Sequence, residues 1–359
     1  MRSSPVSLPP VTETPPGVDL ERLRPWFAAH VDGATGGALH ASLISGGRSN
    51  LTYAIGDDTH EWVLRRPPLG HVLPTAHDMA REYKVLSALA GTDVPVPHTH
   101  AFCDDVAVND APFYVMELID GVILRTPQEI AALSHDDARR CSEVLIDVLV
   151  AIHAVDYEAV GLSDFGHPDG YVERQVRRWG EQWERSKTRE LPSIDELARR
   201  LRAALPESPP PTIVHGDYRL DNTMLAPGDP GRIVAVLDWE MATLGDPLAD
   251  LGLYLLYWAR DEAQTGNVGA TISSDAGFLT RDEVVERYAK LSGRDVSQLD
   301  FYEALAAYKL AIILEGIHAR YLMGKTVGDG FQHIGGLVEV MVQSALDRCS
   351  QSSIAALRG

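Results

Sequence analysis

One segment constrains this chain more than any other. His215-Gly216-Asp217 is followed at close range by Asn222, and a β-branched run then leads to Asp238. The runs Thr212–Val214 and Ile233–Leu237 predict strands on either side of a loop. Such a loop can offer one carboxylate to a hydroxyl group and two oxygen ligands to a divalent cation. Phosphoryl transfer depends mainly on that arrangement, because the protein positions the reactants and neutralises charge on the transferring group.

We interpret Asp217 as the residue that positions and deprotonates the acceptor hydroxyl. Asn222 and Asp238 are then the ligands of Mg²⁺, which prefers oxygen donors and keeps several of its waters. An isolated His-x-Asp would carry little weight as a motif. The combination of His215, Asp217, Asn222 and Asp238 in this order favours a catalytic interpretation, with His215 as a brace of the loop.

This pattern resembles a known superfamily. His-x-Asp-x-x-x-x-Asn followed by a strand-borne Asp is similar to the catalytic and metal loops of protein kinases. In the form seen here, with Leu237-Asp238-Trp239-Glu240 after it, the pattern resembles the aminoglycoside phosphotransferase and choline kinase superfamily. The segment from Gly245 to Leu251 is similar to that superfamily's Gly-Asp-Pro-x-x-Asp-Leu. We expect its Asp250 to hydrogen-bond the backbone of the catalytic loop.

The resemblance also implies a nucleotide site. Arg65 stands where the superfamily has a phosphate-binding Lys, and Glu82 is placed to pair with it. Arginine can hold phosphate in a bidentate manner, although it is bulkier and geometrically stricter than lysine. The small residues of a loop before residue 51 let backbone N–H groups approach phosphate oxygens, without the full GxGxxG. The implied residues are Gly46, Gly47, Ser49 and Asn50 in the loop, Arg65 and Glu82, and Met116, Glu117 and Leu118 in an adenine-binding hinge.

Three further pieces resemble one branch of the superfamily: Tyr171–Gln175, Trp179 and Leu310–Tyr321. That branch includes bacterial stand-alone proteins and the kinase-like region fused to some eukaryotic acyl-CoA dehydrogenases. The resemblance covers the chain from about Leu39 to Cys349. It implies that the acceptor hydroxyl belongs to an aminoglycoside-like or a hydroxyacyl-CoA-like molecule.

Hydrophobic patterns divide the chain into a leader and two lobes. Residues 1–18 contain five prolines and predict a disordered leader. Residues 19–118 predict an N-terminal nucleotide-binding lobe, with a strand hairpin at residues 38–64. Its other expected elements are helices over Leu20–His30 and residues 75–90, and strands over Thr99–Cys103 and Phe113–Ile119.

Residues 119–359 predict a larger catalytic and substrate lobe that is mostly helical. Its two β-branched runs, on either side of the catalytic loop, are expected as an embedded strand pair. With the resemblance, these patterns imply an α+β bilobal protein-kinase-like fold, in which an antiparallel sheet with one crossing helix forms the small lobe. Helices are expected over Asp136–Val155, Tyr171–Lys187, Ile194–Leu205, Arg281–Ser292, Phe301–Met323 and Gly335–Cys349.

Composition limits the partners and the compartment. The formal net charge of −19 argues against nucleic-acid binding, which needs a basic face. Cys103, Cys141 and Cys349 have neither CxxC nor zinc-site spacing, which fits a reducing cytosol. The N-terminus lacks an apolar secretory segment, and no run of about 18 apolar residues is present. We therefore expect a cytoplasmic protein that does not bind membranes.

Together the patterns predict an ATP- and Mg²⁺-dependent phosphotransferase acting on the hydroxyl of a small molecule. Choline-like amino alcohols, sugars, homoserine and macrolides are rival acceptors, GTP is a rival donor, and the oligomeric state is open. A second hypothesis is a catalytically weak nucleotide-binding pseudokinase or scaffold, motivated by Arg65 and the incomplete glycine loop. Hydrolase chemistry has no support, since the chain has no G-x-S-x-G or H-E-x-x-H motif.

Overall fold

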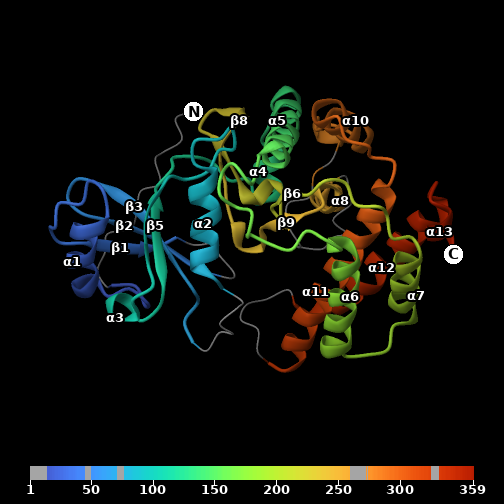
Figure 1. The fold of residues 1–359 in the computed structure, drawn as a ribbon, viewed down its shortest axis with the longest axis horizontal. Helices are drawn as coiled ribbons and strands as arrows, with labels where there is room; N and C mark the ends of the chain where they lie inside the picture. The colour runs from blue at the N-terminus through green and yellow to red at the C-terminus, as the bar shows by residue number, and fades with distance from the viewer. Residues whose placement is uncertain (1–13, 45–49, 71–76, 259–271, 273, 325–330) are drawn as a thin grey trace. The chain divides into compact units, whose positions relative to one another are not determined.

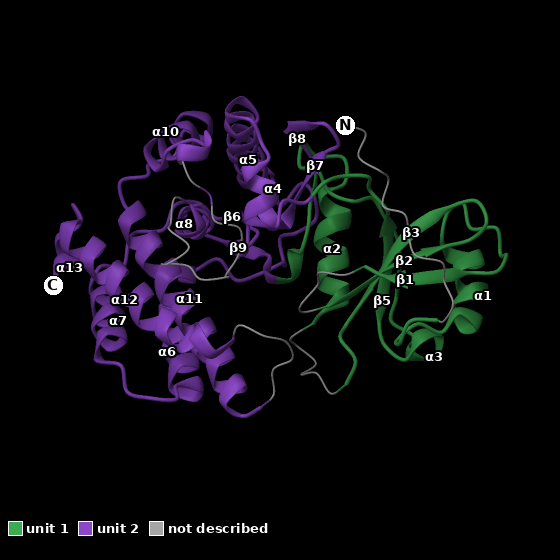
Figure 2. Cartoon of the chain, turned by 180° about the vertical axis from the view of Figure 1, so that it is seen from behind, with its two compact units in different colours: residues 1–122, 234–240 green, residues 123–233, 241–359 purple. Residues whose placement is uncertain are grey.

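The computed structural model describes residues 14–44, 50–70, 77–258, 272, 274–324 and 331–359 (Figure 1). It divides the chain into two compact units (Figure 2). The first unit comprises residues 1–122 and 234–240, so it extends past the predicted boundary at residue 118 and includes a segment from later in the chain. The second unit comprises residues 123–233 and 241–359. The predicted α+β class is confirmed, because the model combines an antiparallel sheet with many helices.

The first unit is built on a five-stranded antiparallel sheet in the order β1-β2-β3-β5-β4. In β3, Arg65 lies opposite Thr52 of β2 and Tyr114 of β5. The predicted hairpin is present as β2 and β3, which pair antiparallel over their whole length. The strands are β1 (His40–Leu43), β2 (Leu51–Gly56), β3 (Glu61–Arg66), β4 (Thr99–Cys103) and β5 (Phe113–Glu117).

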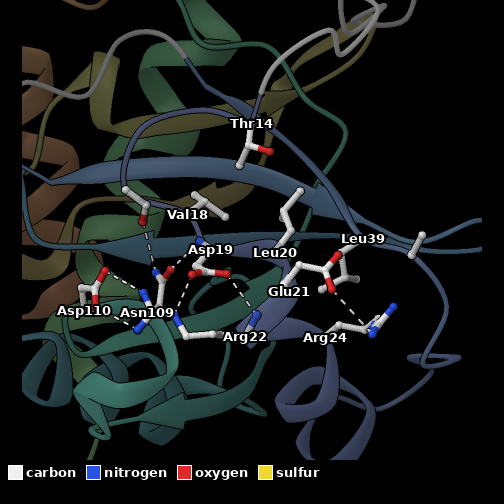
Figure 3. A pocket seen from close by; sticks show the side chains of 12 residues that line it. Thr14, Val18, Asp19, Leu20, Glu21, Arg22, Arg24, Leu39, Asn109 and Asp110 are labelled. Carbon is white, nitrogen blue, oxygen red and sulfur yellow. Dashed lines mark hydrogen bonds and ion pairs between the residues drawn. The ribbon is translucent and has the colours of Figure 1, made fainter.

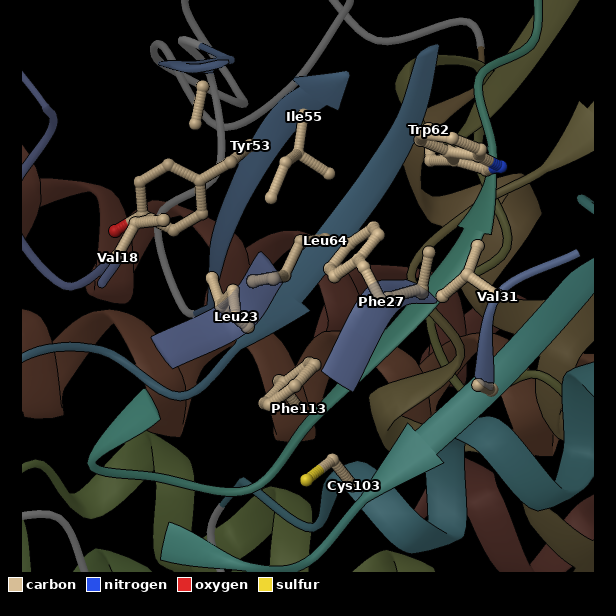
Figure 4. Packing of buried hydrophobic residues seen from close by; sticks show 13 residues of the cluster. Val18, Leu23, Phe27, Val31, Tyr53, Ile55, Trp62, Leu64, Cys103 and Phe113 are labelled. Carbon is tan, nitrogen blue, oxygen red and sulfur yellow. The ribbon is translucent and has the colours of Figure 1, made fainter. Parts of the chain in front are cut away.

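Helices cover both faces of this sheet (Figure 1). α1 (Leu20–His30) places Leu23 and Phe27 in an apolar cluster with β3 and β5 (Figure 4). Because successive strand side chains point to opposite faces, Leu64 joins that cluster while Arg65 faces α2 (Met79–Leu89). The face that α2 covers thus carries the pair of Arg65 and Glu82 among buried apolar residues such as Val63 and Val85. A short helix, α3 (Val106–Asn109), follows β4.

The last residues of the predicted leader belong to the first unit. The Tyr53 hydroxyl donates to the Pro16 carbonyl at 2.6 Å, and the Asn109 amide donates to the Gly17 carbonyl at 3.2 Å. Val18 is buried in the apolar cluster. Residues 14–18 are therefore held in place because strand and helix side chains satisfy their carbonyls, whereas residues 1–13 lie outside the described part of the chain.

The second unit is mostly helical, as predicted. α11 (Leu299–Leu322) is its central helix and packs against α6, α7, α8 and α12. The other helices are α4 (Pro127–Ala131), α5 (His135–Ala154), α6 (Tyr171–Ser186), α7 (Pro192–Ala203), α8 (Pro247–Tyr257), α10 (Arg281–Ser292), α12 (Ile334–Gln351) and α13 (Ala355–Arg358).

The expected pairing of the two β-branched runs is wrong. β6 (Thr212–Val214) pairs with β9 (Thr243–Gly245), while β8 (Asp229–Val236) pairs with β7 (Thr223–Ala226). The short strands β7 and β9 carry too little alternation to have been recognised from the sequence. α8 was also missed, because it is buried on every side and so shows no amphipathic period.

The structure bears on the expectations about membrane-spanning segments and about the three cysteines. Among the residues that the model describes, no helix combines the length and the apolar character needed to cross a bilayer. Cys103, Cys141 and Cys349 are all buried free thiols. Burial raises the pKa of Cys141 to about 12, so that this thiol stays protonated at neutral pH.

Candidate active site

The candidate residues form two groups, one in each unit. In the first unit, the guanidinium of Arg65 joins two carboxylates. Its Nε lies 3.0 Å from Glu82 Oε1, and its Nη2 lies 2.6 Å from Asp238 Oδ1. A third contact runs from Nη1 to the Thr52 hydroxyl at 3.3 Å. The pairing of Arg65 with Glu82 is present as predicted, and its extension to Asp238 is new.

Burial controls the electrostatics of this group. The Glu82 side chain is 2% exposed, and burial raises the pKa of its carboxyl while Arg65 opposes that rise. Although burial disfavours its charge, Glu82 and Asp238 hold the pKa of Arg65 above its usual value. The guanidinium is therefore a permanent cation on the α2 face of the sheet, and Asp238 is its more accessible partner, with 32% of its side chain exposed.

The backbone of Asp238 is unusual. Its φ of 65° lies in the left-handed region, which one other described non-glycine residue, Asp110, also adopts. Asp tolerates this region better than most residues because its short side chain is polar. The neighbouring Trp239 is buried and donates from Nε1 to the Val236 carbonyl at 3.0 Å. This bond closes the turn after β8 that carries Asp238.

Asn50 is the described part of the expected phosphate loop. It is 2% exposed, and its Nδ2 donates to Glu240 Oε2 at 3.2 Å, while its Oδ1 is buried without a hydrogen-bond partner. The contact joins the start of β2 to the turn after Asp238. Gly46, Gly47 and Ser49 lie outside the described residues.

The expected hinge lies at the end of β5. Met116 is buried and Glu117 is exposed. The Glu117 N–H donates to the His98 carbonyl at 2.8 Å, which commits this donor to the pairing with the chain before β4. A backbone contact to adenine would therefore have to use the Glu117 carbonyl or the backbone of Leu118.

In the second unit, the loop after β6 brings Asp217 and Asn222 together. The Asn222 Nδ2 donates to the Asp217 carboxylate Oδ2 at 2.9 Å and to its main-chain oxygen at 2.8 Å. Arg219 also lies beside this carboxylate, with 3.4 Å between Nε and Oδ2, and forms an ion pair with Asp221 at 3.1 Å. The Asp217 side chain is 31% exposed. One carboxylate oxygen is thus fixed by protein donors.

Asp250 braces this loop, as expected. Its carboxylate accepts from the N–H groups of His215 at 2.6 Å and Gly216 at 2.8 Å. Asp250 is itself buried, and His153 lies 3.4 Å away with its other ring nitrogen 2.8 Å from the Tyr288 hydroxyl. Although burial favours the neutral acid, these hydrogen bonds hold the pKa of Asp250 below its usual value. His215 is fully buried, and its Nδ1 accepts from the Asp217 N–H at 3.2 Å.

Lys309 on α11 also belongs to this group, and the sequence motifs did not predict it. Its Nζ donates to the Gly216 carbonyl at 2.8 Å and lies 5.8 Å from the centre of the Trp179 ring. Burial lowers its pKa, while Asp217 and Asp250 oppose that change. The available signal was a single Lys in the long apolar stretch of α11 between Glu303 and Glu315.

The described pockets differ in their relation to these residues. A cavity of about 40 Å³ in the second unit is lined by Gly216, Asp250, Lys309 and aromatic side chains of α6 and α11. A hollow of about 420 Å³ in the first unit lies at the start of α1 (Figure 3). There Arg22 pairs with Asp19 and Asp110, and none of the predicted site residues that the structure describes lines it. The candidate site is therefore defined by the carboxylates and cations of the two groups described above, and the larger hollow lies apart from the residues that carry them.

Comparison with known proteins gives relatives for most of the chain. Residues 40–302 match the model of the phosphotransferase enzyme family, APH. The chain is 32% identical over 337 residues to acyl-CoA dehydrogenase family member 11 of Rattus norvegicus, covering 91% of this chain and 43% of that protein. It is 35% identical over 313 residues to acyl-CoA dehydrogenase family member 10 of Mus musculus, and this match covers 84% of this chain and 28% of that protein. The chain thus spans less than half the length of these relatives.

Solved structures agree with these matches. A protein of Ralstonia eutropha assigned to the aminoglycoside phosphotransferases has a TM-score of 0.80 at 33% identity, covering 92% of this chain and 98% of that one. A thermostable mutant of the aminoglycoside phosphotransferase APH(4)-Ia, in a ternary complex with AMP-PNP and hygromycin B, has a TM-score of 0.58 at 15% identity. That match covers 90% of this chain and 97% of the other, and it shows a shared fold.

Proposed function

Because the chain belongs to the phosphotransferase enzyme family, we propose that it transfers the γ-phosphate of ATP to a hydroxyl group of a small molecule, with Mg²⁺ as its cofactor. The observation that carries this proposal is the contact of Asn222 with Asp217 in a loop braced by buried Asp250. The Asp217 carboxylate is partly exposed and is held by protein donors at one oxygen only. An acceptor hydroxyl could bind its other oxygen, whereas a purely structural role in the turn would leave that oxygen unused.

Asp217 is the general base of the proposed reaction. Asn222 and Arg219 lie on its Oδ2, which leaves Oδ1 to accept a hydrogen bond from the acceptor hydroxyl. As the oxygen attacks the γ-phosphorus, the hydroxyl proton passes to this carboxylate. Since the backbone on both sides of Asp217 is held by hydrogen bonds, little reorientation is needed at the moment of transfer.

Asn222 and Asp238 are the proposed Mg²⁺ ligands. The donor set fits this ion, because amide and carboxylate oxygens are hard ligands and a magnesium site takes several further oxygens from phosphates and water. Among the described residues no cluster of three or more His, Cys, Asp and Glu side chains could hold a metal alone, and the proposed set does not require one. When bound, the ion would neutralise charge on the phosphates.

The first unit supplies the proposed nucleotide site. Arg65, kept in place by Glu82, would bind phosphate oxygens, together with backbone groups of the loop that contains Gly46, Gly47 and Ser49 and ends at Asn50. The hinge of Met116, Glu117 and Leu118 would meet the purine through its backbone. Adenine and guanine present opposite donor and acceptor patterns to such backbone groups, so GTP is the donor to compare with ATP.

Two acceptor classes follow from the relatives. The Ralstonia eutropha structure suggests an aminoglycoside-like alcohol, and the acyl-CoA dehydrogenase family members suggest a hydroxyacyl-CoA-like one. We propose that the protein acts in the cytoplasm, where ATP and both kinds of acceptor are available. No partner other than the small-molecule acceptor is required.

The test is an acceptor screen with the full chain and Mg·ATP. Candidate alcohols from both classes are assayed for ADP release, and products are sought as a mass gain of one phosphate. We expect Asp217→Asn to reduce turnover by a factor of about 10² to 10⁴ with little change in nucleotide affinity. The exposed Asp58→Asn is the matched control. Full activity of Asp217→Asn would remove the assigned base.

One observation favours a second candidate, a nucleotide-binding pseudokinase. Asp238 Oδ1 is engaged by Arg65 at 2.6 Å, so that a proposed metal ligand already has a cation. In a pseudokinase this ion pair would persist when Mg·ATP is added, and the nucleotide would bind without turnover. Slow ATP hydrolysis by the wild type, lost in Asp217→Asn, distinguishes the kinase from this alternative.

A further inference from the structure

Two charged residues of α11, Glu303 and Glu315, are buried, and Lys309 is partly buried. Glu303 pairs with Arg281 and Arg348, and Glu315 accepts from the Thr188 N–H and hydroxyl at 2.9 and 2.6 Å. These contacts tie α11 to neighbouring segments. For Lys309, by contrast, none of the described carboxylates lies within ion-pair distance, and its bond goes to a main-chain oxygen of the loop that carries Asp217.

That main-chain oxygen belongs to the peptide that joins Gly216 to Asp217, and the Asp217 N–H of the same peptide donates to His215 Nδ1 at 3.2 Å. The Gly216 N–H donates to Asp250 from α8, and the Gly216 carbonyl accepts from Lys309 of α11. Gly216 has a φ of 82°, and an added Cβ would lie 2.7 Å from the Met241 carbonyl. The peptide therefore adopts a backbone conformation that favours glycine, in a space that admits no side chain. Such a turn needs external hydrogen bonds to remain in one orientation.

The position of Lys309 is costly for a purely structural residue. An ammonium group loses hydration when it is buried, and the reduced pKa of Lys309 reflects that loss. An apolar residue would fill the space between Trp179 and the loop without this cost. A partly buried cation that bonds to a single carbonyl is explained if the orientation of that carbonyl matters.

We infer that Lys309 is a positioning residue for the proposed phosphotransfer, holding the Gly216 carbonyl so that the next residue, Asp217, presents its carboxylate to the acceptor. This inference rests on the proposed function of Asp217. Lys309 acts through the backbone, and the first unit, which carries the proposed nucleotide residues, contributes no part of this contact.

The first test needs no activity. Hydrogen–deuterium exchange of the peptide that covers residues 212–222 is compared between wild type, Lys309→Met and the control Lys290→Met, an exposed residue of α10. We expect faster exchange of this peptide in Lys309→Met alone, with the rest of the second unit unchanged. If Lys309→Met does not fold, Lys309→Leu, which likewise has no hydrogen-bond donor, takes its place.

The second test is kinetic. Lys309→Met should lower kcat by a factor of about 10 to 100, the range for loss of a hydrogen bond to a charged group, with KM for ATP within about twofold of wild type. Placed on Asp217→Asn, the same change should cost almost nothing more, because the loop then has no base to position. Lys309→Ala should regain turnover with added propylamine but not with propanol.

The outcomes separate the two proposals. An inactive wild type with altered exchange in Lys309→Met contradicts the phosphotransfer proposal and leaves the loop contact standing as a structural brace. Unchanged exchange together with wild-type kcat in Lys309→Met overturns the inference. So does a loss of kcat that is additive with Asp217→Asn, because Lys309 would then act independently of the base.

Discussion

At the scale of single residues, the site depends on charges that are buried in pairs. Arg65 pairs with two carboxylates, Glu82 and Asp238, and all three residues belong to the first unit. Breaking a buried pair costs much more than the pair contributes, because the remaining charge has neither water nor a partner. The identity of the side chain at position 65 therefore affects stability as well as the proposed nucleotide binding.

We predict that Arg65→Met lowers the free energy of unfolding by about 3 to 5 kcal/mol, since Glu82 is left buried and unpaired. Urea denaturation followed by circular dichroism measures this loss. The double variant Arg65→Met with Glu82→Met should recover most of it. A double variant as unstable as the single one would mean that packing, not the charge of Glu82, causes the loss.

At the scale of elements, turns and helix contacts place the site residues. The β2–β3 hairpin that carries Arg65 is closed by Asp57, whose carboxylate accepts from the N–H groups of Thr35, Thr59 and His60 at 2.8 to 2.9 Å. The hydroxyls of Thr35 and Thr59 add two more bonds. These donors, the Thr35 N–H foremost, hold the pKa of Asp57 well below its usual value of 3.8.

This hairpin gives a pH-dependent prediction. A carboxyl whose folded-state pKa is depressed contributes stability above its unfolded-state pKa, and that stability is lost as the pH falls through the folded-state pKa. Asp57→Asn should therefore reduce the free energy of unfolding by about 2 kcal/mol at pH 7. The difference from wild type should shrink below about pH 4, measured by urea denaturation over pH 3 to 7. The exposed neighbour Asp58 provides the control, Asp58→Asn, for which no such trend is expected.

Close helix packing holds the Asp250 brace in place. At Gly252 of α8 an added Cβ would lie 2.6 Å from the main-chain carbon of Tyr302 on α11. Gly252→Ala should force these helices apart and lower the free energy of unfolding by about 1 to 3 kcal/mol. Gly336→Ala on α12, where a Cβ meets nothing within 4 Å, should instead stabilise by up to about 1 kcal/mol. Thermal unfolding of both variants tests this contrast, and equal shifts would contradict it.

At the scale of the whole molecule, the proposed site residues are distributed over both units of the chain. Asp217 and Asn222 belong to one unit, while Arg65 and Asp238 belong to the other. The chain itself links them, because β8 begins in the second unit and ends in the first, just before Asp238. A nucleotide that binds the native protein therefore stabilises it against unfolding by mass action.

We predict that Mg·AMP-PNP at 100 times its Kd adds about 2.7 kcal/mol to the free energy of unfolding and raises Tm. Differential scanning calorimetry with and without EDTA measures both the nucleotide and the metal contribution. Arg65→Lys, which keeps a cation, should retain much of the shift, and Arg65→Met should lose it. Absence of a shift in the wild type at any accessible concentration would contradict nucleotide binding.

The sequence by itself determined the local structure and the chemical motif. The bounds of α1, β4, β6 and α10 match the predicted ranges. Their signals are local, because the apolar residues and the turn residues that define each element lie close together in the sequence. The pairing of Arg65 with Glu82, and the bracing of the Asp217 loop by Asp250, followed from the resemblance of their motifs.

Only the tertiary structure decided which distant segments meet. It paired β6 with β9, buried α8 on all sides, joined Arg65 to Asp238 and Asn50 to Glu240, and set Lys309 against Gly216. Periodicity specifies which face of an element is buried but not what covers that face. Contacts between residues far apart in the chain depend on the packing of all the elements between them, and no local pattern encodes that packing.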